Sequence, residues 1–139
     1  MDEYKPKEMK VDKKYEKFTK RKYYYFSRYD EGIKIDDEEG WFSVTAEPIA
    51  KYAAYFLEGV EDALVVDCCC SVGGNLIQFA LHKNTKFAVG VDLSHTRIAN
   101  AKNNCLVYKV PFGKCNFVHE DISKVDFIEI LELPKPSEG

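Results

Sequence analysis

Three aspartates in this sequence stand at or just beyond the end of a short apolar run. They are Asp67, Asp92 and Asp121, and the runs are residues 63–66, 87–91 and 115–118. One aspartate in such a place is often a turn former or a helix cap. Three in matching positions, beside a Gly-Gly turn, indicate a common edge where a ligand binds.

The residues around these aspartates indicate which ligand the edge would take. Gly73-Gly74-Asn75 predicts a flexible turn, and Asp92 lies 19 residues beyond Gly73, a spacing that suits a carboxylate binding both ribose hydroxyls. Asp67 faces the place where a dinucleotide would put its phosphates, so its charge favours a cationic ligand. S-adenosylmethionine carries an ammonium and a sulfonium group, which fits that sign. The turn lacks the full G-x-G-x-x-G of the dehydrogenases.

The elements that hold these residues alternate between strands and helices. The apolar runs predict three strands, with a helix over 76–81 after the first and a helix over 95–108, capped by Ser94, after the second. This βαβαβ order predicts an α/β, Rossmann-like fold. The first strand is apolar at every position, which is typical of a central strand buried on both faces. A short helix is expected within 125–133.

The chain before the first strand predicts a helical extension. Aromatic and basic residues mix at near-helical spacing over 15–30, and a loop is expected over 32–42. Thr45 is the expected N-cap of an amphipathic helix with Pro48 in its first turn. Its expected apolar stripe is Ile49, Ala50, Ala53, Ala54, Phe56 and Leu57. We expect a disordered leader at 1–14, the extension at 15–62, the cofactor-binding domain at 63–133 and a tail at 134–139.

Composition and charge limit the function classes. The 139 residues are 45% hydrophobic, which is ordinary for one globular domain, and they contain no apolar run long enough for a membrane span. We therefore expect a cytosolic or nuclear protein. The net charge is −3, yet ten Lys and Arg residues outnumber the acids within the first 30 positions. The tyrosines among them favour nucleic-acid binding; a solvated leader with locally packed tyrosines is the open alternative.

Five cysteines fit neither a disulfide framework nor a zinc site; they are Cys68, Cys69, Cys70, Cys105 and Cys115. Adjacent residues of a strand point to opposite faces, so the triplet is not expected to converge on a metal. We expect small buried residues in a reducing compartment, and no metal site.

Five blocks between residues 15 and 121 match one known family. The blocks are KFTKRKYYYFSRYDEGIKID, EGWFSVTAEPIA, VVDCCCSVGGNLIQFA, VGVDLSHTRIANAKNN and FVHEDI. In these blocks the chain resembles the trimethylguanosine synthases, class I methyltransferases that use S-adenosylmethionine. The resemblance implies a cap-specific guanine-N2 methyltransferase. Such enzymes convert the 7-methylguanosine caps of small nuclear and nucleolar RNAs into trimethylguanosine caps.

The resemblance implies a set of cofactor contacts. Asp67 and the Gly73-Gly74-Asn75 turn would hold the methionine end of S-adenosylmethionine. Asp92 would bind the ribose, and Asp121 the adenine amino group. Leu93 and Ile122, which follow these two aspartates, and Thr45, on the N-terminal side, would also lie against the cofactor.

For the cap, the resemblance implies three further contacts. Lys17 would contact phosphate, Ser43 would neighbour the guanine, and Asn104 would form one wall of the base slot. A solvated lysine and a residue that ends a helix are the open alternatives for Lys17 and Asn104. Trp41 and Phe42 suit either base stacking or packing against the core. The implied partner is a 7-methylguanosine-capped small RNA, and the implied location is the nucleus and nucleolus, with the cytoplasm as a second one.

The sequence departs from the family pattern in two places. Ser71 stands where the family has glycine, and a serine there costs about 1 kcal/mol if its φ is positive. Cys69 replaces an aromatic, which predicts a smaller local core. The family's catalytic Pro-Pro-Trp segment has no match, since the single tryptophan is Trp41. We therefore name no catalytic residue and expect an incomplete domain, inactive alone, whose first strand is an exposed apolar edge.

Two alternatives stay open at this point. The first is a non-catalytic domain that binds S-adenosylmethionine, capped RNA or a protein partner. The second is a class I methyltransferase that acts on another substrate.

Overall fold

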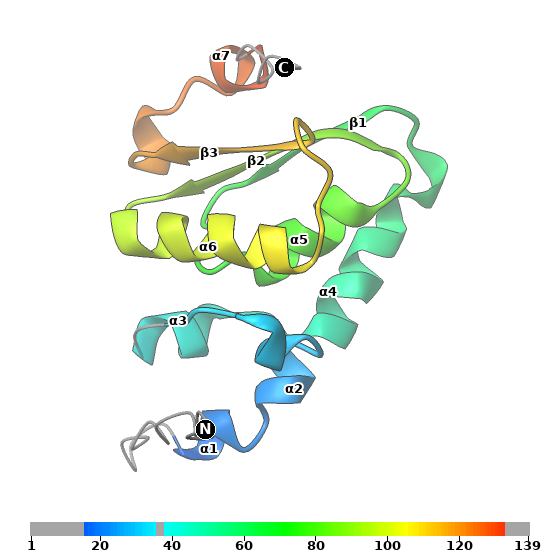
Figure 1. Ribbon diagram of the computed structural model, residues 1–139. Coiled ribbons are helices and arrows are strands. Elements are labelled where there is room, and N and C mark those ends of the chain that lie inside the picture. The colour runs from blue at the N-terminus through cyan, green and yellow to red at the C-terminus, as the bar shows by residue number, and fades with distance from the viewer. Residues whose placement is uncertain (1–15, 36–37, 133–139) are drawn as a thin grey trace, which may run out of the picture.

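A three-stranded parallel sheet is the centre of the computed structural model, which describes residues 16–35 and 38–132. β1 (Ala63–Asp67), β2 (Thr85–Asp92) and β3 (Cys115–His119) lie in that order. α5 (Gly74–Leu81) and α6 (His95–Val107) cover one face, and α7 (Phe127–Leu131) covers the other (Figure 1). The predicted α/β, Rossmann-like arrangement is confirmed.

β2 is buried because helices cover both of its faces. Val89 and Val91 pack with Ile130 of α7, whereas Ala88 packs with Leu76 of α5. Successive residues of a strand point to opposite faces, so a strand covered on both sides needs an apolar run without alternation.

β1 lies at an edge of the sheet. Among the described residues it pairs only with β2, and Leu64 is 52% exposed. The prediction of a strand buried on both faces is therefore wrong for β1. The expectation of an exposed apolar edge is confirmed, because no strand of the described chain pairs with the outer side of β1.

α4 (Glu47–Ala54), continued by the 3-10 helix η3 (Tyr55–Gly59), leads into β1. Pro48 lies in its first turn as expected, but the N-cap residue is Ala46 and no side chain caps the helix. The prediction of Thr45 as N-cap is wrong, because its hydroxyl bonds to another element. Ala50 and Ala54 are buried, whereas the expected apolar residues Ile49 and Phe56 are 55% and 78% exposed.

Ahead of α4, the described part of the N-terminal extension contains four short helical elements. They are α1 (Glu16–Thr19), α2 (Lys22–Tyr25), the 3-10 helix η2 (Tyr29–Glu31) and α3 (Glu38–Ser43). The predicted loop over 32–42 is wrong at its end, because Trp41 and Phe42 belong to α3. Trp41 is buried, and its ring lies 6.0 to 6.1 Å from the rings of Phe18, Tyr25 and Tyr29. The indole therefore packs inside the extension, where an exposed loop would have left it in solvent. The expected leader and tail lie outside the described residues.

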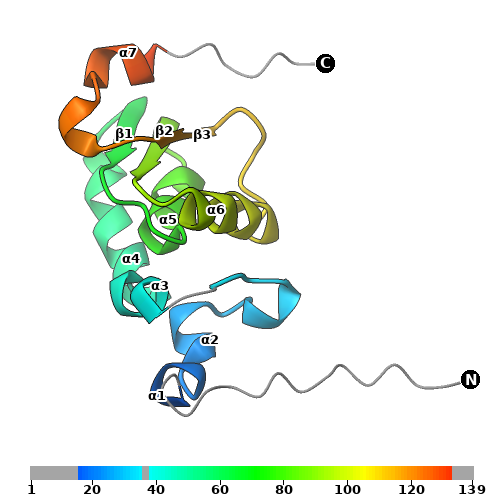
Figure 2. The same cartoon turned by 90° about the vertical axis from the view of Figure 1, so that its left-hand side faces the viewer.

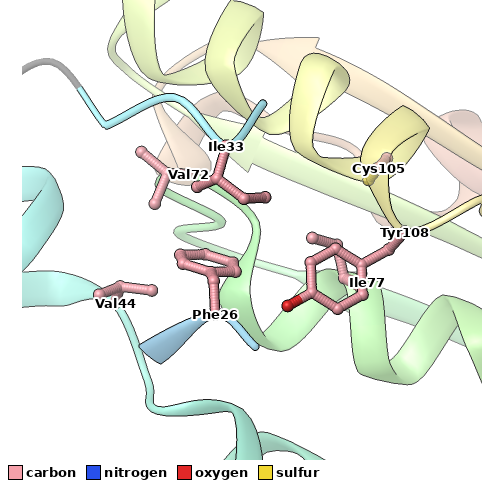
Figure 3. Close-up of a cluster of buried hydrophobic side chains, with 7 residues drawn as sticks. All are labelled: Phe26, Ile33, Val44, Val72, Ile77, Cys105 and Tyr108. Atoms are coloured by element: carbon pink, nitrogen blue, oxygen red, sulfur yellow. The ribbon is translucent and has the colours of Figure 1, made fainter. Parts of the chain in front are cut away.

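The extension lies against the helical face of the sheet (Figure 2) and shares a core with it. Figure 3 shows Phe26, Ile33 and Val44 from the extension beside Ile77 of α5 and the other members of the cluster. The remaining members are Val72, Cys105 and Tyr108. Phe26 is 2% exposed and Ile77 is fully buried, so the extension is held to the sheet by apolar packing.

The cysteines are not all buried. Cys70 and Cys105 are buried, but Cys68 and Cys69 are exposed. The prediction of buried residues is therefore wrong for these two, which lie in the turn beyond β1 rather than in the strand. The smaller local core expected from Cys69 does not follow, because this side chain faces solvent.

Candidate functional site

The carboxyl ends of the three strands meet at one edge of the sheet. In the parallel register Asp67 lies opposite Gly90, and Asp92 lies opposite His119. Asp121 follows β3 by two residues and caps the 3-10 helix η4 (Ile122–Lys124). The structure therefore brings the three predicted aspartates to the same edge, where open α/β sheets bind ligands.

The glycine turn between β1 and α5 is tightly enclosed. Gly73 has φ 95° and precedes α5. A Cβ on Gly74 would lie 2.7 Å from Cγ2 of Val44 and 3.0 Å from the carbonyl oxygen of Thr45. Only glycine fits at position 74, so the backbone of 44–45 and the turn approach each other closely.

Ser71 is strained, as its replacement of glycine predicted. Its φ is 49°, and its side chain is buried with a hydroxyl that has no hydrogen-bond partner among the described residues. Its backbone N–H donates to Oδ2 of Asp92 over 2.9 Å. The contact with Asp92 holds the turn in this conformation.

Asp92 is buried and joins two elements. Besides the Ser71 N–H, it accepts a hydrogen bond from the backbone N–H of Ser94 over 2.9 Å. The guanidinium of Arg97 lies 3.8 Å from Oδ1. Each carboxylate oxygen has two acceptor positions, so one on each remains beyond these backbone bonds. The sequence analysis did not identify Arg97 as a neighbour of Asp92. The only signal for it is its position three residues after Ser94, in the first turn of the helix that Ser94 caps.

Asp67 stands in a less polar environment. Burial raises the pKa of its carboxyl, the nearby Asp92 raises it further, and a backbone hydrogen bond from Cys69 opposes both. Asp67, Cys68 and Asn75 form the polar part of the wall of a hollow of about 510 Å³. The rest of its wall is apolar, formed by Ala53, Leu57, Leu64, Val65, Val66 and Phe79. A half-buried carboxylate in the wall of a largely apolar hollow favours a ligand with a cationic group.

Thr45 bonds directly to the first turn of α5. Nδ2 of Asn75 donates to Oγ1 of Thr45 over 2.8 Å. The two candidate residues, thirty positions apart in the chain, therefore lie side by side, and this bond replaces the helix cap expected of Thr45.

The carboxyl of Asp121, beyond the third strand, has a pKa shifted in the opposite direction from that of Asp67. Oδ1 of Asp121 accepts hydrogen bonds from Oγ and the backbone N–H of Ser123, over 2.7 and 2.9 Å. These bonds lower the pKa of the Asp121 carboxyl. Leu93 is 69% exposed, and Ile122 packs partly buried against the core of β2. Leu93 thus offers an apolar surface at this edge, and Ile122 has a second role in the core.

Lys17, a candidate cap residue, lies beside aromatic rings of the extension. The ammonium of Lys17 is 4.9 Å from the ring centroid of Phe18 and 5.2 Å from that of Phe42. Phe42 is 61% exposed and is followed by the exposed Ser43. The structure therefore brings Lys17 beside the exposed Phe42, with the exposed Ser43 next along the chain, whereas Trp41 is inside the extension.

Asn104 does not reach that surface. Its side chain is fully buried and bonds to Lys34, Val72 and Asn103. The amide is used within the protein, so this conformation does not offer it as a wall for a base.

Residues 16–35 and 38–132 contain no group of three or more His, Cys, Asp or Glu side chains that could hold a metal ion. Within the same ranges, no helix has the length and apolar character needed to cross a membrane.

The chain is similar to known trimethylguanosine synthases. It is 32% identical to that of Schizosaccharomyces pombe over 90% of this chain and 50% of the relative. It is 34% identical to that of Saccharomyces cerevisiae over 68% of this chain and 30% of the relative. The chain thus spans half the length of these proteins or less.

Solved structures support the fold. A structure from Porphyromonas gingivalis W83 assigned to the methyltransferases has a TM-score of 0.56 and 11% identity, over 79% of this chain and 28% of that one. Magnesium protoporphyrin IX methyltransferase from Synechocystis, solved with bound SAH, has a TM-score of 0.50 and 16% identity, over 78% of this chain and 52% of that one. The likeness shows the methyltransferase fold.

A sequence profile of one family covers more than half of the chain and includes β1, the glycine turn and all three aspartates. The profile matches residues 62–133. The chain belongs to the RNA cap guanine-N2 methyltransferase family.

Proposed function

We propose that this chain is the cofactor-binding part of a methyltransferase that modifies N2 of 7-methylguanosine caps on small nuclear and nucleolar RNAs. The observation that carries the proposal is the edge of the sheet, where Asp67, Asp92 and Asp121 lie beside the glycine turn. Membership of the family supports the choice of a capped RNA as the partner.

The residues at this edge fit S-adenosylmethionine. The Asp67 carboxylate would pair with the ammonium, because it is a half-buried acidic group that lines a hollow. The Gly73-Gly74 turn would let the ligand approach the backbone, and Asp92 would bind ribose hydroxyls with its remaining acceptor positions. Asp121 would accept from the adenine amino group, with Leu93, Ile122, Thr45 and Asn75 around the ligand. When bound, the cofactor supplies an electrophilic methyl group.

The extension would bind the cap. Lys17, which carries a positive charge at an exposed aromatic surface, would contact the anionic phosphates, and Ser43 would neighbour the base. The protein's part in the reaction would be to position the two substrates and exclude water from the reacting atoms. No described residue is assigned as a base or nucleophile. The nucleus is the proposed location.

Calorimetry with S-adenosylhomocysteine and with a 7-methylguanosine cap analogue tests this proposal on the chain as it stands. We expect saturable binding of both. Absence of S-adenosylhomocysteine binding at millimolar concentration would contradict the cofactor assignment. We expect no methyl transfer to the cap analogue, because the sequence holds no match to the family's Pro-Pro-Trp segment; turnover would show that other residues serve this step.

A further inference from the structure

Asn104, near the end of α6, makes an unusually complete set of hydrogen bonds. Nδ2 donates to the carbonyl oxygens of Val72 and Lys34, over 2.8 and 3.1 Å. Oδ1 accepts from the backbone N–H of Lys34 over 2.8 Å and from Nδ2 of Asn103 over 3.1 Å. A side-chain amide has two donor hydrogens and two acceptor positions, and all four are in use. The residue is fully buried, so none of these bonds is shared with solvent.

Two of these hydrogen bonds are made to the backbone of a single residue of the extension, Lys34. Asn104 accepts from the N–H of Lys34 and donates to its carbonyl oxygen, as the neighbouring strand of a sheet would do. Only an amide offers a donor and an acceptor side by side at this size. Asn103 adds a bond of 2.8 Å from Nδ2 to the carbonyl oxygen of Gly32. The Asn-Asn pair therefore fixes residues 32–34 on α6.

The third bond reaches the turn proposed to hold the cofactor. Val72 lies between the strained Ser71 and Gly73. A Cβ on Gly73 would lie 3.5 Å from Cα of Ala101, so α6 packs directly behind this turn. One side chain thus connects the turn at 71–73 to the extension at 32–34.

We propose that Asn104 is a positioning residue that couples the cofactor-binding turn to the extension on which the cap contacts lie. This inference rests on the proposed function, because it takes the turn and the extension as the two substrate sites. Nδ2 of Asn104 donates to both Val72 and Lys34. A ligand that restricts the motion of the turn should therefore also restrict the motion of Lys34. Loss of the two hydrogens on Nδ2 of Asn104 should therefore remove the coupling between the two sites, although Asn104 contacts neither ligand.

Residue-resolved hydrogen exchange with S-adenosylhomocysteine tests the coupling. In the wild-type chain, binding at the turn should slow the exchange of the Lys34 amide severalfold. Asn104→Asp keeps an acceptor for Lys34 but cannot donate to Val72, so this slowing should disappear and the affinity for S-adenosylhomocysteine should fall about five- to tenfold. Asn103→Ala, the matched control, leaves the bonds from Asn104 to Val72 and Lys34 in place and should keep the slowing. Equal protection of Lys34 in wild type and Asn104→Asp would overturn the proposal.

A second variant guards against loss of the fold in Asn104→Asp. Lys34→Pro removes the N–H that Asn104 accepts and leaves α6 intact, so it should also weaken S-adenosylhomocysteine binding; an unchanged affinity would overturn the coupling. If the wild-type chain does not bind S-adenosylhomocysteine, the cofactor assignment fails. The coupling is then tested without ligand: Lys34→Pro should change the exchange of residues 72 and 73, and a change confined to the extension would overturn it.

Discussion

At the residue scale, Ser71 combines backbone strain with a buried hydroxyl that lacks a partner among the described residues. Ser71→Gly should stabilise the chain by about 1 to 2 kcal/mol. Relief of the left-handed conformation and loss of the unpaired hydroxyl together outweigh the entropy cost of glycine. Denaturant unfolding measures the change.

Ser71→Ala is the matched control, because it removes the hydroxyl and keeps the strain. It should stabilise the chain by less than Ser71→Gly. If the two variants are equally stable, the positive φ is not the source of the effect.

Asp67 is the residue at which folding and ligand binding should oppose each other. Its pKa is raised, so the folded chain holds the proton more tightly than the unfolded chain does. Its contribution to stability is therefore present at low pH and is lost as pH rises from the unfolded pKa through the folded pKa. Binding of an ammonium group needs the ionised form, so affinity for S-adenosylhomocysteine should rise over the same interval.

Asp67→Asn separates these effects. It should bind S-adenosylhomocysteine about ten- to a hundredfold more weakly, since it removes a charge-assisted hydrogen bond, and it should unfold at higher denaturant concentration near neutral pH. Calorimetry and unfolding over a pH series check both. A variant with wild-type affinity would remove Asp67 from the cofactor site.

At the scale of elements, the contact between the glycine turn and residues 44–45 decides how α5 begins. Gly74→Ala should cost about 1 to 3 kcal/mol, because the new Cβ would press on Val44 and Thr45. Gly59→Ala is the control, since nothing lies within 4 Å of the added Cβ there, and it should change the unfolding free energy by less than about 0.5 kcal/mol. Similar urea midpoints for the two variants would contradict the close approach.

The two predicted helix caps show when a cap can be predicted from local sequence and when it cannot. Ser94 caps α6 as predicted, because its hydroxyl accepts from the backbone N–H of Arg97 over 3.3 Å. Thr45 has an equally suitable side chain, but Asn75 from α5 bonds to its hydroxyl, and α4 begins later. The first cap depends on residues three apart, whereas the second depends on a contact thirty residues away.

At the scale of the whole molecule, β1 presents an open apolar edge. Leu64 is half exposed there, and open edges promote association between strands of separate chains. Leu64→Lys should therefore shift the chain towards monomer in sedimentation at high concentration. Leu106→Lys replaces a leucine of α6 that is 76% exposed and away from β1. It should leave the association unchanged; an equal effect of both variants would show that exposed apolar area in general, and not the strand edge, causes it.

The sequence by itself determined the order of strands and helices, the family, and the three aspartates at the carboxyl edge. Apolar runs, turn residues and matching blocks are local properties, and parallel strands must bring their carboxyl ends to one edge. Only the tertiary structure decided that Trp41 lies inside the extension, that Asp92 holds Ser71 and Ser94, and that the Asn104 amide is used internally. These outcomes depend on contacts between distant segments, which fix the packing and hydrogen-bond partners of each side chain.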